Sequence, residues 1–246
     1  IEHDYFLGLS KSEKNIFKKL FFYLEAIKLK KFENILKKTT GIFSISPFEQ
    51  AYFSEKYGKK AAYIPVFHRA KKGNLTEEKG AYILYHGDLR ISDNVRAALF
   101  LIDAYKETPY QFLVASSCKN KAVLKQIKKH QNIHFKEIPN QESLDILFQK
   151  AQINTLFTFQ KTGIKLKLLH TLYQGRYVIS NSAMIEDTGL ETLCELANTK
   201  KHLLEKTAQL FEQLFSNEQM IARQEKLIGF NPEENAKKIN SIIFKQ

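Results

Sequence analysis

Residues 162–181 read TGIKLKLLHTLYQGRYVISN, and this stretch decides the fold of the chain. A glycine opens a segment with helical spacing of apolar residues, Gly175 ends it, and Tyr177–Ser180 follows as a short apolar strand. The apolar residues of the helical segment form one broad arc: Ile164, Leu166, Leu168, Leu169, Leu172 and Tyr173. A helix with one apolar side, followed at once by a buried strand, is typical of an α/β domain.

The start of this helix is a candidate anion site. Free N–H groups and the helix dipole both favour an anion at a helix N-terminus. Lys167 and His170 lie on the same stripe as Gly163, where the phosphate and ribose of a nucleotide would sit. An ordinary amphipathic helix with one solvated side has the same pattern, so the residues alone leave both interpretations open.

Strands and helices alternate on both sides of this stretch. We expect strands over 81–85, 112–115, 133–135, 153–157, 177–180 and 193–196, and helices over 94–105, 119–129, 143–150, 164–173 and 200–215. Alternation at this spacing predicts right-handed crossovers and a mostly parallel sheet. Residues 81–228 are therefore expected to form a Rossmann-like α/β domain that binds its ligand at the carboxyl ends of the strands.

The segments outside this domain show other patterns. A long helical pattern runs from Ser12 to about Lys38, and Ser46 is the expected cap of a short helix that Pro47 opens. Strands are expected over 42–46 and 61–66, a polar linker over 69–80, and a last helix, capped by Asn231, within 229–246. Because the chain opens in mid-motif without methionine, we expect residues 1–68 to be the C-terminal part of another α/β domain.

Composition limits the class of protein. The chain has 246 residues, a formal net charge of +12 and two cysteines, Cys118 and Cys194. Two unpatterned cysteines fit neither a disulfide framework nor a zinc site, and they indicate a reduced, cytoplasmic protein. The positive charge attracts nucleic acid, anionic lipid or phosphorylated substrates. Since the lysines are scattered and accompany no nucleic-acid-binding motif, no specific nucleic acid is expected, whereas weak adhesion to an anionic membrane surface is compatible with the sequence.

Two further loops follow expected strands. In the first, Gly87 lets the backbone approach a ligand and Arg90 could clamp a phosphate with two hydrogen bonds. In the second, Ile138 and Pro139 could present backbone groups to a nucleobase. For the first loop the alternative is an ordinary strand–helix connection. For the second it is a simple turn, which the residues alone favour.

Hydrolytic chemistry finds no support in the sequence. There is no His-Glu-x-x-His metal motif, no nucleophile-elbow glycine pattern and no pair of loop carboxylates. We expect neither a bound metal nor another cofactor.

The order of these pieces resembles the retaining GT-B glycosyltransferases of the group 1 or family 4 type. Their second domain often begins with a strand and glycine loop like Leu84–Leu89, with an asparagine near the place of Asn94. Their most telling element, Gly-x-x-x-Lys-x-Leu-Glu-Ala-x-x-x-Gly before an apolar strand, is similar to Gly163, Lys167, Leu169, His170, Gly175 and Tyr177–Ser180 here. Residues 188–191 and the terminal helix also look like that family.

The resemblance implies transfer of a sugar from a nucleotide-sugar donor to a glycan or lipid-linked acceptor in surface polysaccharide synthesis. It implies a donor diphosphate held by Gly87, Arg90, Gly163, Ile164 and Lys167, because fixed cations and amides stabilise the leaving diphosphate without a metal. It assigns the ribose to His170, the base to Ile138 and Pro139, and the donor sugar to Thr162.

The chain departs from the family at two positions. Family members usually carry glutamates at the places of Thr162 and His170, and a histidine is not a permanent acceptor as a carboxylate is. A GT-B-like nucleotide-binding protein that lost catalysis is therefore one alternative. The positive charge leaves a basic nucleic-acid-binding protein as a second alternative.

Overall fold

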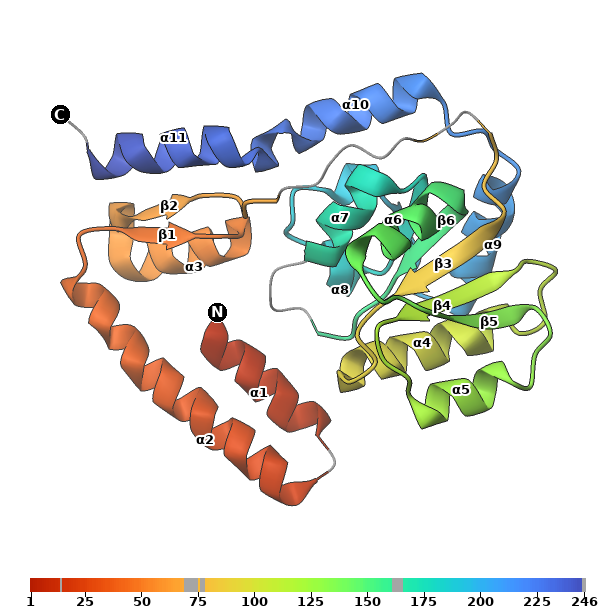
Figure 1. The fold of residues 1–246 in the computed structure, drawn as a ribbon. Coiled ribbons are helices and arrows are strands. Elements are labelled where there is room, and N and C mark those ends of the chain that lie inside the picture. The colour runs from red at the N-terminus through yellow and green to blue at the C-terminus, as the bar shows by residue number, and fades with distance from the viewer. Residues whose placement is uncertain (14, 69–74, 76–77, 161–165, 245–246) are drawn as a thin grey trace. The chain divides into compact units, whose positions relative to one another are not determined.

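The computed structural model describes residues 1–13, 15–68, 75, 78–160 and 166–244 (Figure 1). It divides into two compact units. The first contains the described residues of 1–67, 160–165 and 229–246, and the second contains those of 68–159 and 166–228.

A six-stranded parallel sheet forms the centre of the second unit. Its strands are β3 (Tyr82–His86), β4 (Phe112–Ser116), β5 (Ile133–Glu137), β6 (Ala151–Leu156), β7 (Tyr177–Ser180) and β8 (Glu195–Leu196). They lie in the order β5-β4-β3-β6-β7-β8, and each strand is parallel to its neighbours. The parallel sheet predicted over 81–228 is confirmed.

Helices cover both faces of this sheet (Figure 1). The second unit contains α4 (Ser92–Tyr105), α5 (Lys121–Ile127), α6 (Gln141–Lys150), α7 (Leu166–Gln174), α8 (Ser182–Ile185), the 3-10 turn η3 (Glu191–Leu193), α9 (Lys200–Phe211) and α10 (Asn217–Leu227). One buried cluster joins α4, α5 and α9 to the sheet, and a second cluster joins α6 to its other face. Because both faces are covered, β3, β4 and β7 consist mostly of apolar residues, which made them visible in the sequence.

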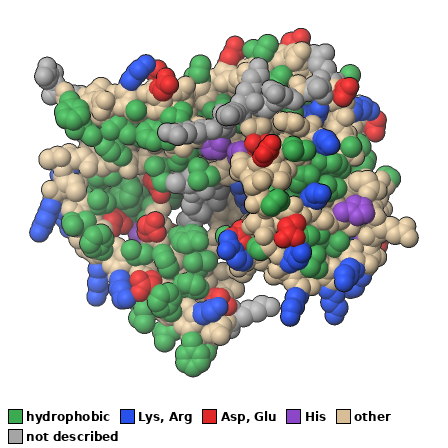
Figure 2. Space-filling view, viewed as in Figure 1, with side chains coloured by type: hydrophobic (Ala, Val, Ile, Leu, Met, Phe, Trp, Pro, Cys, Tyr) green, Lys and Arg blue, Asp and Glu red, His purple; other side chains and the backbone are tan. Residues whose placement is uncertain are grey.

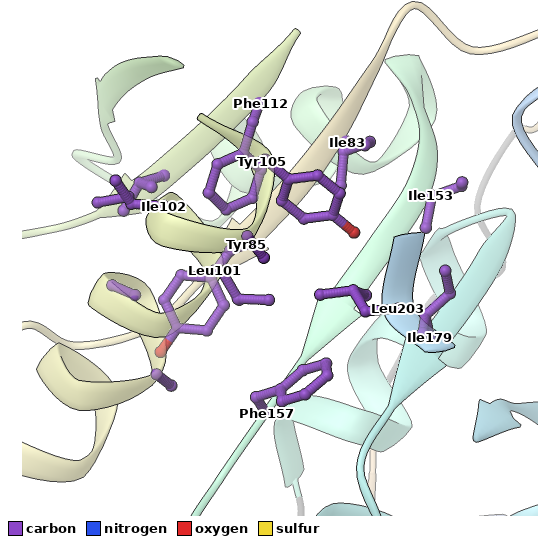
Figure 3. Packing of buried hydrophobic residues seen from close by; sticks show 14 of the residues in the cluster. Ile83, Tyr85, Leu101, Ile102, Tyr105, Phe112, Ile153, Phe157, Ile179 and Leu203 are labelled. Carbon is purple, nitrogen blue, oxygen red and sulfur yellow. The ribbon is translucent and has the colours of Figure 1, made fainter. Parts of the chain in front are cut away.

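The larger cluster is packed from alternate residues of the central strands (Figure 3). Ile83 and Tyr85 of β3 face α4, whereas Leu84, between them, belongs to the cluster on the other face. The Tyr105 hydroxyl of α4 lies 2.9 Å from the Thr207 hydroxyl of α9, so this buried polar group has a partner. Full burial of such large side chains contributes about 1.5–3 kcal/mol each.

The first unit is built from short elements. They are α1 (Glu2–Ser12), α2 (Ile16–Phe32), the 3-10 helix η1 (Glu33–Lys38), β1 (Ile42–Ser44), α3 (Pro47–Tyr57), η2 (Gly58–Lys60), β2 (Ala61–Tyr63), η4 (Ile228–Phe230, whose first residue is assigned to the second unit) and α11 (Pro232–Ile243). β1 and β2 pair in parallel. The Asn235 side chain of α11 donates to the Pro65 carbonyl oxygen, and Lys238 donates to that of Tyr63, so the last helix lies beside β2.

The long helix predicted from Ser12 to about Lys38 is confirmed from Ile16 onward, with a later start than expected. It tightens from Glu33 onward into a 3-10 helix, and the separate helix α1 before it was not predicted. Asn15 causes the break between the two helices, because its side-chain oxygen accepts hydrogen bonds from the amides of Phe17 and Lys18 and so caps a new helix. The cap predicted at Ser46 is confirmed, since its hydroxyl accepts from the Glu49 amide at 3.1 Å.

Part of the segment predicted as a linker, 69–80, lies outside the described residues. Of the described part, Leu75 packs against the larger cluster, and the Gly80 amide donates to the Gln152 side chain at 2.7 Å. This part is therefore attached to the sheet unit. The assignment of residues 1–68 to the C-terminal part of another α/β domain stays a prediction.

Within the described residues, no helix has the length and apolar character needed to span a membrane.

Candidate functional site

The strand order places a topological switch point between β3 and β6. The connection from β3 runs to one side of the sheet through β4 and β5, and the chain then returns to β6 on the other side of β3. In open parallel sheets, ligands bind beyond the carboxyl ends of the strands at such a switch point. The carboxyl end of β3 is His86, which leads directly into Gly87.

Gly87 is tightly surrounded. Its amide donates to the Ala115 carbonyl oxygen at 3.1 Å. A Cβ at this position would lie 3.0 Å from the Tyr85 hydroxyl and 3.2 Å from Cγ of Asn94. The Tyr85 hydroxyl donates to the Asn94 carbonyl oxygen at 2.9 Å, and Asn94 Nδ2 donates to that of Asp88 at 3.0 Å. The loop after β3 is therefore fixed to the first turn of α4 at a spacing that suits glycine.

Lys167 joins α7 to this loop. Its Nζ donates to Asn94 Oδ1 at 3.2 Å, and Asn94 itself holds the loop. The structure thus brings together Gly87 and Lys167, which are eighty residues apart in the sequence. A lysine cation beside a glycine loop at the switch point can bind a phosphate.

Arg90 is engaged elsewhere. Its Nε and Nη2 both contact the Asp88 carboxylate, with Nη2 2.6 Å from Oδ2, and its side chain is 76% exposed. The pKa of Asp88 is far below its usual range, first because of the Arg90 hydrogen bonds and also because of that from Cys118. To clamp a phosphate, the guanidinium would have to leave this carboxylate.

The His170 side chain, on α7, contacts side chains of α6. Its Nε2 is 3.1 Å from Asp145 Oδ1 and 2.8 Å from Gln141 Nε2, and 17% of its side chain is exposed. The Phe148 ring packs against it at a centroid distance of 5.2 Å. The sequence indicated His170 but not these partners on α6.

His86 was also missed as a site residue, although its place immediately before Gly87 could have indicated it. It is buried, its ring packs edge-on to Phe148 at 5.0 Å, and its Nδ1 has no hydrogen-bond partner among the described residues. Burial, with smaller contributions from Lys167 and His170, lowers the pKa of His86 to about 3, so its ring is neutral at physiological pH.

A third histidine belongs to the same row of rings. The His68 ring stacks on Tyr173 with an interplanar angle of 6° and lies 5.6 Å from His170. Burial and the neighbouring His170 lower the pKa of His68.

The two residues expected to contact the nucleobase, Ile138 and Pro139, differ in their exposure to solvent. Ile138 is buried and its amide donates to the Ser116 carbonyl oxygen at 3.0 Å, so that amide is occupied, whereas Pro139 is exposed. Thr162, Gly163 and Ile164 lie outside the described residues. No group of three His, Cys, Asp or Glu within the described part of the chain is arranged to hold a metal ion.

Comparisons with known proteins identify the fold. No family model matches the sequence, and no curated protein matches it. A solved glycosyltransferase from Rickettsia africae ESF-5 is 15% identical, with a TM-score of 0.65 over 88% of this chain and 67% of that one. TarM is 12% identical, with a TM-score of 0.70 over 87% of this chain and 45% of that one.

Sucrose-phosphate synthase from Thermosynechococcus elongatus is 14% identical, with a TM-score of 0.66 over 97% of this chain and 65% of that one. The chain thus spans 45–67% of the length of these three proteins. A mutant of S. aureus TarM has also been solved in complex with fondaparinux, alpha-GlcNAc-glycerol and UDP. The resemblance to the GT-B glycosyltransferases is confirmed at the level of the fold, and this chain has the fold of those enzymes.

Proposed function

We propose that the chain belongs to a glycosyltransferase that moves a sugar from a nucleotide-sugar donor to a glycan or lipid-linked acceptor, in surface polysaccharide synthesis. The observation that carries the proposal is the meeting of Gly87, Asn94 and Lys167 at the switch point of the sheet. The fold supports it, because similar solved structures are glycosyltransferases and one of them holds UDP.

In this proposal the donor diphosphate lies between the Gly87 loop and Lys167. Sugar transfer breaks the bond between the sugar and the diphosphate, so negative charge grows on the leaving group. A fixed ammonium group stabilises that charge more in the transition state than in the ground state. Lys167 is held by Asn94 and so needs little reorganisation to do this. Arg90 would contribute after exchanging Asp88 for phosphate, and the amides of Gly163 and Ile164 would complete the phosphate site.

The remaining sequence-based assignments fit around this diphosphate. His170 would bond the ribose, Ile138 and Pro139 would adjoin the base, and Thr162 would contact the donor sugar. We expect no metal to take part.

Nucleic-acid binding is the less favoured alternative. Figure 2 shows Lys and Arg side chains spread over the visible face and mixed with Asp and Glu. Several lysines of the chain are paired with carboxylates, including Lys119 with Glu137 at 2.9 Å and Lys206 with Glu195 at 2.7 Å. A nucleic-acid site would instead gather unpaired cations along one groove.

Titration calorimetry tests the function. We expect the protein to bind one nucleoside diphosphate from a panel of UDP, GDP, ADP, CDP and TDP saturably, and to retain that preference in 0.3 M salt. A donor-hydrolysis screen with the matching nucleotide-sugars then separates an enzyme from an inactive nucleotide-binding protein. Equal, salt-sensitive binding of every polyanion, with no preferred nucleotide, would contradict the proposal and favour nucleic-acid binding.

We also propose that the protein works in the cytoplasm at the inner face of a membrane. The supporting observation is α2, where Phe17, Leu20, Phe21 and Leu24 are between 48% and 82% exposed. Hydrophobic side chains are prominent in the region of α1 and α2 in Figure 2. The helix carries five lysines, and its one acidic residue, Glu25, is paired with Lys28 at 2.6 Å.

An apolar face with flanking lysines suits an anionic lipid surface. Sedimentation with vesicles tests it. We expect the wild type to sediment with phosphatidylglycerol vesicles. The double variant Phe17→Ser with Phe21→Ser should not bind them. Equal recovery of the wild type and the double variant would contradict it.

A further inference from the structure

The first turn of α4 is hydrogen-bonded to the chain on both sides of the switch point. In this turn, the Asp93 carboxylate accepts from the Thr158 hydroxyl at 2.6 Å and from the Phe159 amide at 3.1 Å. Thr158 and Phe159 lie just after the carboxyl end of β6. Beside Asp93, the Asn94 side chain bonds the loop after β3 and the Lys167 ammonium group. One helical turn therefore joins the two strands that flank the switch point to the lysine of the proposed phosphate site.

α4 has no side-chain cap of its own. Its N-cap residue is Ile91, whose side chain has no atom that accepts from the first amides of the helix. An aspartate in the first turn of a helix commonly acts on the helix itself, through the dipole. The Asp93 carboxylate also bonds a segment 65 residues further along the chain. The arrangement of this first turn therefore depends on bonds to other parts of the fold.

The segment that Asp93 bonds is itself firmly held. Thr158 is 5% exposed, its amide donates to Asn181 Oδ1 at 3.3 Å, and its carbonyl oxygen accepts from Asn181 Nδ2 at 2.7 Å. The Arg96 guanidinium, also on α4, lies 3.8 Å from the centroid of the Phe159 ring, which is a cation–π contact. Asp93 thus connects α4 to a segment that Asn181, directly after β7, also holds in place.

The bonds of Asp93 also explain how a carboxylate can lie near a proposed anion site. An unbonded carboxylate close to a phosphate would repel it. Both Asp93 oxygens accept hydrogen bonds from the end of β6, Oδ2 from the Thr158 hydroxyl and Oδ1 from the Phe159 amide. Asp93 therefore acts on the site through the backbone that it holds, and not as a ligand of the substrate.

We propose that Asp93 is a positioning residue for the donor diphosphate: by holding the first turn of α4, it keeps Asn94 in the place from which Asn94 orients Lys167. Without Asp93, the turn loses both hydrogen bonds to the end of β6, and the 3.2 Å contact between Asn94 and Lys167 loses that support. The proposal rests on the proposed function and deepens it, since it names a residue that acts through Lys167.

Calorimetry on Asp93→Ala tests the proposal. The probe is whichever of UDP, GDP, ADP, CDP and TDP binds the wild type most tightly, measured beside its own nucleoside. We expect Asp93→Ala to weaken binding of the diphosphate by about 10-fold and to change that of the nucleoside by less than about 2-fold, because only the phosphate contact depends on Lys167. The double variant Asp93→Ala with Lys167→Ala should bind the diphosphate within about 2-fold of Lys167→Ala alone, because Asp93 acts through Lys167.

Two further variants separate positioning from general destabilisation. Thr158→Val removes the hydroxyl donor but keeps the Phe159 amide bond, so it should weaken diphosphate binding by about 3-fold. Asp103→Ala removes a carboxylate from an exposed position of the same helix, where it pairs with Lys106 and Lys200, and should leave both affinities unchanged. If Asp93→Ala does not fold, Thr158→Val decides by the same comparison of diphosphate and nucleoside binding.

Three results would overturn the proposal while the proposed function stands. They are equal weakening of diphosphate and nucleoside binding in Asp93→Ala, affinity losses that multiply in the double variant, and a lower melting temperature of Asp93→Ala with unchanged diphosphate affinity. If no diphosphate of the panel binds the wild type, the proposed function fails and this inference fails with it.

Discussion

His86 makes the sheet unit sensitive to acid, and the effect can be calculated. Burial lowers the pKa of His86 from its ordinary 6.5 to about 3. As the pH falls below 6.5, the unfolded chain takes up a proton at this residue and the folded protein does not. Stability is therefore complete above pH 6.5 and is lost as the pH approaches 3, at up to about 1.4 kcal/mol for each pH unit.

The substitution His86→Asn removes the titrating ring. Between pH 7 and pH 5, the wild type should lose about 2 kcal/mol of unfolding free energy that the variant keeps. Urea denaturation followed by far-UV circular dichroism at both pH values measures this difference. Carboxylates elsewhere affect the wild type and the variant equally, so the comparison cancels them.

His202→Asn is a matched control, since His202 is exposed on α9 and its removal leaves the buried ring in place. If the wild type and His86→Asn lose the same free energy between pH 7 and pH 5, the buried, neutral state of His86 is refuted.

Three other substitutions test separate contacts. Gly87→Ala should displace Asn94, because the new Cβ would lie 3.2 Å from its Cγ, and calorimetry should show weaker diphosphate binding with little change in nucleoside binding. Arg223→Met should cost about 3 kcal/mol or more by urea denaturation, because the buried guanidinium donates to the carbonyl oxygens of Leu172, Gly175 and Arg176 at the end of α7. An unchanged denaturation midpoint would count against that role. In the first unit, burial raises the pKa of Glu33, but hydrogen bonds from Lys56, Tyr52 and Tyr57 outweigh it and lower that pKa below 4.5. The stabilisation that ionised Glu33 contributes is therefore present above pH 4.5 and lost as the pH falls further. Glu33→Gln should lower the melting temperature at pH 7 and make the melting temperature less dependent on acid pH. Equal profiles of melting temperature against pH for the wild type and the variant would contradict this.

The sheet could be predicted from the sequence because its signals are local. β6 is buried at every position, and the apolar runs of β4 and β7 predict strands that are covered on both faces. α1 and the break at Asn15 were missed, because the apolar spacing continues across a single capping side chain.

The site was only partly predictable. Gly87 and Lys167 stand in recognisable local patterns, but the Asn94 bridge between them joins residues 73 positions apart. The Asp145–His170 contact likewise depends on how α6 and α7 pack, and no spacing within either helix shows it. The pairing of Arg90 with Asp88 lies within three residues, yet the sequence offered no reason to prefer that carboxylate over a phosphate.

The central claim, that a nucleoside diphosphate binds beside Lys167, is tested most directly by calorimetry on the wild type and Lys167→Ala. Asn94 orients the Lys167 ammonium group at 3.2 Å, and a charge-assisted bond to phosphate contributes about 1.5–3 kcal/mol. The account predicts that the substitution weakens binding of the preferred diphosphate by about 10- to 100-fold and leaves binding of the matching nucleoside unchanged. Equal diphosphate affinities for the wild type and Lys167→Ala would contradict it.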